Sequence, residues 1–145
     1  MLPPAPLPLC HAQHSHDLLA RNLSAVVNSH HDDWLDGSAD DAAFSRNLER
    51  FQAIWSALSA RFASAPDELL AFEVYNEPHL NMTAPWLNRM NAAVLPLIRT
   101  HNPTRTVFLG GLEWMSPRWI LQHPDGIAML PPSGPVDARE AHTAR

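Results

Sequence analysis

Three short runs of residues hold the side chains of this sequence that could take part in catalysis. His30–Trp34 contains two histidines, two aspartates and a tryptophan, and Asn76–His79 contains an amide, a carboxyl group and a histidine. The third run, Gly110–Trp114, ends in a glutamate and a tryptophan. Carboxyl groups and histidines are the usual groups of general acid–base catalysis. Aromatic faces beside them suit a sugar ring, which has apolar C–H faces and a polar hydroxyl rim.

Each of these runs follows a segment with the pattern of a buried strand. The predicted strands are residues 23–29, 69–75 and 106–109, and the second is a nearly continuous apolar run, as burial on both faces requires. Two predicted helices, over about 41–63 and 83–100, separate the strands and are long enough to be crossovers between parallel strands. This order predicts an α/β fold in which the three runs lie at the carboxyl ends of the strands.

Apolar spacing and end signals support the two long helices. The first has a single apolar stripe at spacings of three and four residues, and Asp40 or Asp41 can cap its start. Thr83 followed by Pro85 marks the start of the second. The predicted buried positions are Phe44, Leu48, Phe51, Trp55, Leu58 and Phe62 in the first helix and Trp86, Met90, Val94 and Leu97 in the second. A weak helix is expected before the first strand and a short one after the third.

Composition and charge exclude several classes of protein. The 145 residues include 10 basic and 15 acidic ones, and a net charge of −5 argues against a nucleic-acid partner, which needs a basic stripe. All basic residues are arginine, so a Schiff-base lysine and a Walker A lysine are excluded. The single cysteine, Cys10, excludes an intrachain disulfide framework and a four-cysteine zinc site. No apolar run reaches the roughly 18–20 residues of a membrane-spanning helix, so no membrane partner is expected.

The segments Val26–Trp34 and Phe72–His79 resemble glycoside hydrolase family 5, the cellulase family. Connecting segments agree with the family in the same order, namely residues 51–62, 98–105 and 110–114. The resemblance covers about residues 15–123, and it implies a (β/α)8 barrel and retaining, endo-acting hydrolysis of β-linked glucan or mannan without a metal or other cofactor. A complete barrel needs roughly 200–250 residues. The chain is therefore interpreted as an α/β partial TIM barrel, about strands three to five with their helices.

Proline-rich segments mark both ends of this domain. Residues 1–10 contain four prolines and are predicted to be an irregular lead-in, and residues 131–145 are predicted to be an irregular tail. The partial catalytic domain is expected to span residues 11–130. No signal-peptide pattern is seen, so the sequence itself indicates no location, whereas the family resemblance implies secretion.

The resemblance also implies a role for each residue of the site. Glu77 takes the place of the general acid/base at the end of strand four, and Asn76 that of the residue that binds the sugar 2-hydroxyl. A glycosidic oxygen is a poor leaving group unless it is protonated, and the same carboxyl group then acts as base toward water. The candidates for substrate binding are His30, which matches a histidine of the cleft after strand three, and His31, Trp34 and Trp114.

Retaining hydrolysis needs a second carboxylate as nucleophile, about 5–5.5 Å from the first. The family has a glutamate on strand seven there, and we expect this chain to contain no counterpart and to be inactive alone. Glu113 follows the third strand but does not match that position. Glu73 is predicted to be a buried, hydrogen-bonded structural carboxylate. Glu140 and His142 faintly resemble the family's strand-six histidine motif, and whether His142 is a remnant of that strand is left open.

Two other functions are left open. One is a non-catalytic carbohydrate-binding remnant that uses Trp34, Trp86 and Trp114. The other is a histidine-rich metal-binding protein, with the candidate ligands Cys10, His11, His14, His16 and Asp17. These histidines do not share one helix face well, and the sequence shows no residues that would orient them as ligands. They are therefore interpreted as surface histidines, and no metal site is predicted. Finally, an open three-stranded sheet has two unpaired edges, which predicts self-association.

Overall fold

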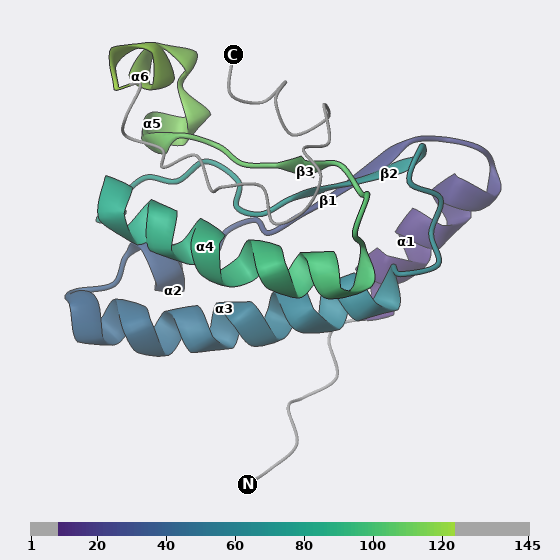
Figure 1. Cartoon of the computed structure of the whole chain (residues 1–145), viewed down its shortest axis with the longest axis horizontal. Helices are drawn as coiled ribbons and strands as arrows, with labels where there is room; N and C mark the ends of the chain where they lie inside the picture. The colour runs from purple at the N-terminus through teal and green to yellow at the C-terminus, as the bar shows by residue number, and fades with distance from the viewer. Residues whose placement is uncertain (1–8, 124–145) are drawn as a thin grey trace, which may run out of the picture.

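A three-stranded parallel sheet and two long helices form the frame of the chain (Figure 1). The structure is a computed structural model that describes the backbone of residues 9–123 and the side chains of residues 15–123. In chain order the elements are α1 (Leu9–Ala20), β1 (Ala25–Asn28), α2 (Asp33–Asp36), α3 (Asp41–Arg61), β2 (Leu70–Glu73), α4 (Ala84–His101), β3 (Val107–Phe108), α5 (Leu112–Met115) and α6 (Pro117–Gln122).

The sheet has the order β1-β2-β3 with both pairs parallel, which confirms the predicted α/β arrangement. Ala25 lies opposite Leu70, and Glu73 lies opposite both Asn28 and Phe108. In Figure 1 all three strands run toward the side of the molecule that carries α2, α5 and α6. We call the residues that directly follow the strands, 29–32, 74–79 and 109–114, the carboxyl edge.

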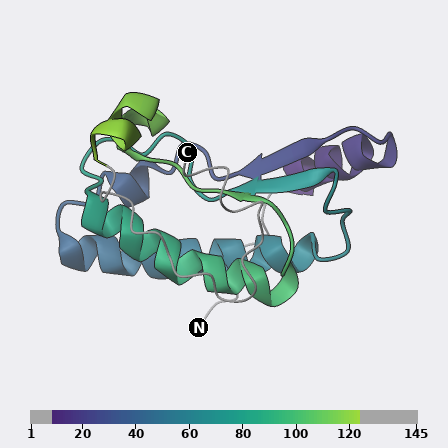
Figure 2. The ribbon, with the colours of Figure 1, turned by 45° about the horizontal axis from the view of Figure 1, so that its top comes forward.

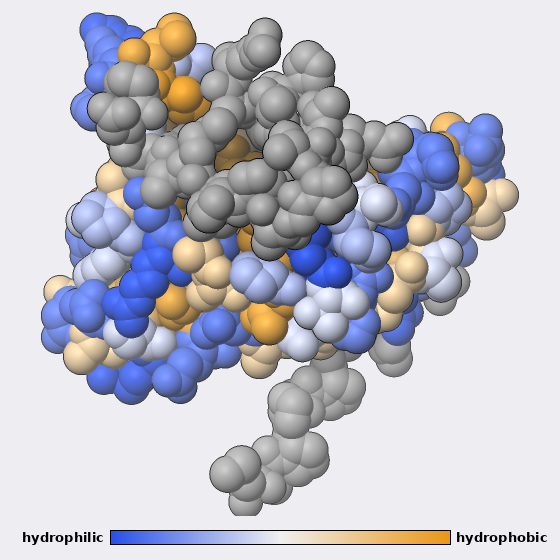
Figure 3. Space-filling view, viewed as in Figure 1, coloured by the Kyte–Doolittle hydropathy of each residue, from blue (hydrophilic) through white to orange (hydrophobic). Residues whose placement is uncertain are grey.

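Both long helices lie on the same side of the sheet (Figure 2). The apolar stripe predicted for α3 is buried at Phe44, Leu48, Phe51 and Trp55, and the indole N–H of Trp55 donates to the carbonyl oxygen of Val74 at 3.1 Å. Asp40 caps the helix, as predicted, by accepting a hydrogen bond from the amide of residue 43 at 2.7 Å. The lower margin of the molecule, along α3, is mostly hydrophilic (Figure 3), so the helix is amphipathic as its spacing requires.

The buried face of α4 differs in part from the prediction. Met90 and Val94 are buried as expected, whereas Trp86 and Leu97 are only half-buried. The other buried positions of the helix are Leu87, Asn91, Leu95 and Ile98. The helix packs against α3, and its buried apolar residues belong to the same hydrophobic core as Phe72 and Val107 of the sheet. The buried residues of α4 therefore cover more than one stripe of the helix. They begin at Leu87, one position after Trp86, where the predicted buried face begins.

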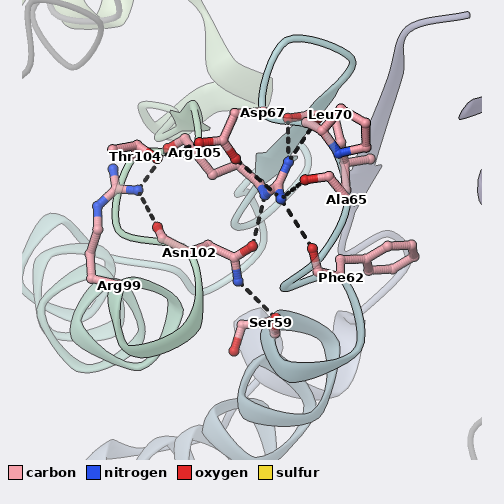
Figure 4. A network of polar contacts seen from close by, with 10 residues as sticks. Ser59, Phe62, Ala65, Asp67, Leu70, Arg99, Asn102, Thr104 and Arg105 are labelled. Atoms are coloured by element: carbon pink, nitrogen blue, oxygen red, sulfur yellow. Dashed lines mark hydrogen bonds and ion pairs between the residues drawn. The ribbon is translucent and has the colours of Figure 1, made fainter. Parts of the chain in front are cut away.

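A buried arginine organises the opposite end of the sheet, which we call the amino edge and define as residues 62–69 and 102–106 (Figure 4). Arg105 is 1% exposed, and burial lowers the pKa of its guanidinium. Its side chain donates hydrogen bonds to the carbonyl oxygens of Phe62, Ala65, Pro66 and Leu70 and to the side-chain oxygen of Asn102. It also pairs with Asp67 at 3.2 Å. Arg105 thus joins the segment before β2 to the segment before β3.

Several boundaries differ from the predictions. The strands are shorter at their ends, and α1, the weak helix expected before β1, begins at Leu9, inside the segment predicted to be an irregular lead-in. Short turns of helix, α2 and α5, occupy segments for which no helix was predicted, whereas α6 lies where a short helix was predicted. The tail predicted for residues 131–145, with Glu140 and His142, lies outside the described residues. Within residues 9–123, no helix is long and apolar enough to cross a membrane.

Candidate active site

The predicted site residues after β1 and β2 lie at neighbouring positions of the carboxyl edge. The amide of Asn76 donates to the carbonyl oxygen of Ser29 at 2.9 Å, so the parallel pairing continues beyond the strands themselves. His30 follows Ser29 directly, and Glu77 follows Asn76. The structure therefore brings His30, Asn76 and Glu77 to one edge of the sheet, each on the segment that the sequence indicated.

Glu77 is exposed and its backbone has a left-handed conformation, with φ of 51°. Seven non-glycine residues of the described chain have positive φ, and all except Asn22 lie in the connections that follow the strands. These six are His31, Glu77, Leu80, Glu113, Trp114 and Met115. Such conformations are unfavourable for residues with a Cβ atom and persist only where surrounding contacts fix them. Four of the six, His31, Glu77, Glu113 and Trp114, lie on the carboxyl edge, so backbone strain is concentrated there, as it often is at functional sites.

Contacts from α2 and the third connection fix the backbone around Glu77. Its carbonyl oxygen lies 2.7 Å from Nδ1 of His79, and the amide of Trp114 donates to the carbonyl oxygen of Pro78 at 3.2 Å. Nδ1 of His79 also lies 3.2 Å from a carboxylate oxygen of Asp36, which is fully buried. No pattern in the sequence indicated a role for Asp36, because an aspartate between two longer elements gives no signal of burial.

A second buried group, Tyr75, lies beneath the connection that follows β1. Its hydroxyl donates to the carbonyl oxygen of Asp32 at 3.0 Å, and the Asp32 carboxylate accepts hydrogen bonds from the Ser29 hydroxyl and, at 2.8 Å, from the indole of Trp34. Burial, together with the charges of Asp36 and Asp32, raises the pKa of Tyr75. Burial also raises the pKa of Asp36, and the neighbouring His79 partly offsets that effect. Tyr75 therefore acts as a neutral hydrogen-bond donor that fixes the loop carrying the histidines.

The two histidines after β1 are both exposed. The ring of His30 meets the ring of His31 edge-on, with centroids 4.0 Å apart. His31 has a positive φ of 59°, which turns the chain away after the strand. An exposed imidazole pair at the carboxyl edge can donate and accept hydrogen bonds from ligand hydroxyl groups.

Only one of the three tryptophans considered as sugar platforms presents its ring mainly to solvent. Trp114 is 61% exposed, and one face of its ring stacks on His79 with centroids 5.5 Å apart. Trp34 is half-buried and packs on α3, with the guanidinium of Arg50 4.2 Å from its ring centre and Phe51 at 6.3 Å. Trp86 is also half-buried and stacks on Phe44 at 4.6 Å. The rings of Trp34 and Trp86 thus contact helix α3, whereas Trp114 lies beside the residues that follow Glu77.

Two other carboxylates near the site, those of Glu73 and Glu113, differ in burial and in hydrogen bonding. Glu73 accepts a hydrogen bond from Asn28 at 3.0 Å, as expected, but is only half-buried, because the face of the sheet that it occupies is not covered by α3 or α4. Glu113 is exposed, in the strained turn after β3.

No metal site is apparent in the described part of the chain. It contains no group of three or more histidine, cysteine, aspartate or glutamate side chains that could hold a metal ion. His16 stacks on Phe62, with centroids 5.4 Å apart, so this ring packs against the end of α3. The side chains of Cys10, His11 and His14 lie outside the described residues.

Known proteins with similar sequences include endoglucanases. The family Cellulase (glycosyl hydrolase family 5) matches residues 16–143. Endoglucanase H of Acetivibrio thermocellus is 42% identical over 98 residues, which make up 68% of this chain and 10% of that protein. Endoglucanase B of Paenibacillus lautus is 30% identical over 106 residues, covering 66% of this chain and 19% of that protein. The chain thus spans a small part of the length of these relatives.

Solved structures of enzymes of this kind contain the same α/β unit. Thermotoga maritima Cel5A in complex with cellobiose gives a TM-score of 0.73 at 26% identity, over 93% of this chain and 42% of that one. The complex of the same enzyme with mannotriose gives 0.73 at 26% identity, over 88% of this chain and 38% of that one. The three strands and their helices therefore correspond to part of a TIM barrel, as predicted.

Proposed function

The chain belongs to glycosyl hydrolase family 5, the cellulase family, and on that premise we propose that it carries the proton-transfer half of a retaining β-glycanase site. Glu77 is the general acid and base, and Asn76 binds the 2-hydroxyl of the sugar. His30, His31 and Trp114 contact the substrate. Trp34 is left out of this set because its ring packs on α3.

The observation that carries the proposal is the hydrogen bond between the Asn76 amide and the Ser29 carbonyl oxygen at 2.9 Å. It supports a common surface for His30, Asn76 and the exposed Glu77, at the edge of a parallel sheet where barrel enzymes have their active sites. In the first step of a complete retaining site, Glu77 protonates the glycosidic oxygen while the second carboxylate attacks the anomeric carbon and the bond to that oxygen breaks. In the second step the same group removes a proton from water.

The substrate that we propose is a β-linked glucan or mannan, cleaved within the chain. Support comes from the names of the relatives, which are endoglucanases. Further support comes from Cel5A, whose structures are described as complexes with cellobiose and with mannotriose. An exposed indole beside imidazoles and carboxyl groups fits the apolar faces and the hydroxyl rim of such sugars.

We further propose that this chain supplies no nucleophile and does not turn over substrate at an ordinary rate alone. By the family resemblance, the nucleophilic glutamate belongs to strand seven, whereas the described residues form a sheet of three strands. Without the second carboxylate no glycosyl-enzyme intermediate forms, and covalent catalysis and positioning are lost together.

Two measurements test this proposal. With an activated aryl β-glycoside, we expect turnover far below the roughly 1–10³ per second of ordinary enzymes. Turnover in that range that disappears in Glu77→Ala would contradict the proposal that the chain supplies no nucleophile.

Added cellotetraose should shift the NMR signals of His30, Asn76, Glu77 and Trp114 and leave those of the exposed His101 unchanged. Binding that shifts none of the four would contradict the site itself.

The non-catalytic binding function remains the second candidate, favoured by the 61% exposure of Trp114. That function needs the aromatic face but not the acid or the amide. It therefore predicts that Asn76→Ala and Glu77→Ala keep the oligosaccharide affinity of the parent chain, whereas Trp114→Ala loses it. The catalytic proposal instead predicts that Asn76→Ala weakens binding, because the 2-hydroxyl loses its partner.

A further inference from the structure

The ring of His79 connects the backbone of Glu77 to a buried carboxylate. Its Nδ1 atom lies 2.7 Å from the carbonyl oxygen of Glu77 and 3.2 Å from Oδ2 of Asp36. The carbonyl oxygen of Glu77 can only accept a hydrogen bond, and so can the carboxylate of Asp36 when it is ionised. Nδ1 must therefore carry a proton, which it shares between the two oxygens. When the ring is neutral, this arrangement selects the Nδ1–H tautomer and leaves Nε2 as an acceptor.

The burial of the Asp36 carboxyl group is energetically unfavourable. It is fully buried, and its Oδ1 atom has no hydrogen-bond partner among the described residues. Its Oδ2 atom accepts from the amide of His79 at 3.3 Å as well as facing the ring. Burying a carboxyl group with one oxygen unsatisfied destabilises a fold. The polar side chains that face this carboxyl group are His79 and Tyr75, and both partly offset the effect of burial on the pKa of Asp36.

The contacts of His79 and Asp36 hold a segment whose backbone is strained at Glu77. Glu77 has a φ of 51°, which needs support from its surroundings. Asp36 accepts a further hydrogen bond, from the amide of Asn81 to its own carbonyl oxygen at 3.0 Å. On the other side of the loop, the indole of Trp114 stacks on the His79 ring. His79 is thus held between α2 and the turn after β3, with Glu77 two residues before it.

We propose that Asp36 and His79 are positioning residues, which hold the backbone of Glu77 through a proton fixed on Nδ1 of His79. This inference rests on the proposed role of Glu77 as the general acid. Asp36 does not touch the sugar. It fixes the ring, the ring fixes the carbonyl group of Glu77, and the direction of the Glu77 side chain follows from its backbone.

The first test needs no variant and no substrate. Long-range ¹H–¹⁵N NMR spectra of the chain show which ring nitrogen of each neutral histidine holds the proton. We expect the proton of His79 on Nδ1, and the exposed His101, for which Nε2–H is the ordinary form, serves as the internal control. A neutral His79 with its proton on Nε2 would overturn the proposal.

The second test compares substitutions at Asp36. Asp36→Ala removes both contacts with His79, and we expect hydrogen exchange at the amides of His79 and Trp114 to speed up by roughly tenfold or more. Asp36→Asn keeps one oxygen that can accept from the ring, so exchange should return to within about threefold of the parent chain. Asp33→Ala, the same change at an exposed aspartate of α2, should alter it by less than about twofold.

The outcomes separate this inference from the proposed function. Equal exchange in Asp36→Ala and Asp33→Ala would overturn the positioning role, even in a chain that responds to cellotetraose at Glu77. A chain that shows the Nδ1–H tautomer and the loosening in Asp36→Ala but no response to cellotetraose would instead contradict the sugar site. Should Asp36→Ala fail to fold, two other measurements still decide the question. One is the tautomer of His79 in the parent chain. The other is hydrogen exchange at the amide of Trp114 in His79→Gln, which should be faster than in the parent chain because the contacts of the ring are lost.

Discussion

The guanidinium carbon of Arg105 lies 5.3 Å from the ring centre of Phe72, so the buried charge of the amino edge rests against the middle of β2. The same strand leads at its other end into Asn76 and Glu77. One strand therefore connects a structural network to the proposed chemical site, with the two at opposite ends. Barrel enzymes separate stability and catalysis between the two ends of their strands in this way.

Arg105→Met should destabilise the chain strongly. The variant leaves the carbonyl oxygens of residues 62, 65, 66 and 70 without the donor that they share. We expect the free energy of unfolding to fall by about 3–5 kcal/mol, measured by urea denaturation. Arg89→Met is the matched control, since Arg89 is an exposed partner of Asp41, and it should cost about 1 kcal/mol or less. Equal effects of the two variants would contradict the structural role of Arg105.

Asp36→Asn should change how stability depends on pH. Burial raises the pKa of Asp36 above its ordinary value of 3.8, so the folded chain holds this proton more tightly than the unfolded chain does. The resulting stabilisation is complete below the ordinary value and is lost as the pH rises through the raised pKa. Asparagine cannot ionise. The free energy of unfolding of Asp36→Asn, relative to the parent chain, should therefore increase from about pH 3 to about pH 7, by about 1.4 kcal/mol per unit of raised pKa.

The control for this pH prediction is Asp33→Asn, because Asp33 is exposed and lies on the same short helix. Because the charge of Asp33 contributes to the raised pKa of Asp36, the stability of this variant relative to the parent chain should also increase with pH, but by less than that of Asp36→Asn. A relative stability of Asp36→Asn that stays flat or falls with pH would show that Asp36 is not held in a setting that favours its protonated form.

Trp114→Ala should weaken oligosaccharide binding if the proposed site is correct. The indole is the exposed aromatic surface beside Glu77, and an aromatic contact of this kind contributes roughly 1 kcal/mol beyond area burial. We expect the dissociation constant for cellotetraose, measured by calorimetry, to rise about fivefold or more. Trp34→Phe and Trp86→Phe keep an aromatic ring in their contacts with α3 and should stay within about twofold. A larger effect at Trp34 than at Trp114 would reverse the assignment.

Val26→Lys should reduce self-association. In the described residues β1 pairs with β2 alone, and Val26 is 55% exposed on the face opposite the long helices. An exposed edge strand is a template for pairing with another chain, and a lysine there opposes such pairing. Sedimentation should show a larger monomer fraction in Val26→Lys than in the parent chain. Leu121→Lys, which adds the same charge at an 80% exposed residue of α6, should leave the fraction unchanged.

The layers and strand order of this fold are predictable from the sequence because each depends on a strong local pattern. The stripe from Phe44 to Phe62 specifies α3, and Thr83 with Pro85 specifies the start of α4. Long separations between apolar runs then require parallel pairing. The short helices α2 and α5 were missed because four-residue turns are decided by tertiary contacts, such as those around Asp36, and not by periodicity.

Within the site, the position of a residue after a strand was predictable, whereas the direction of its side chain was not. Asn76 and Glu77 follow β2 and reach the carboxyl edge by topology alone. Trp34 and Trp114 are of equal interest by residue type, yet one packs on α3 and the other is exposed. The burial of Asp36 and the joint contacts of His79 depend on the approach of α2 to the loop after β2, for which the sequence carries no periodic signal.

The pairing of Ala25 with Leu70 joins residues that are 45 positions apart, since 70 − 25 = 45. A ribosome adds roughly 5–20 residues per second, so β1 emerges roughly 2–9 seconds before the strand with which it must pair. During that interval only local structure such as α3 can form, because closing a long loop is slow until a helix shortens it. The parallel topology that gathers the site at one edge thus makes the order of synthesis part of how the chain folds. Both β1 and β3 depend on β2 for their pairing.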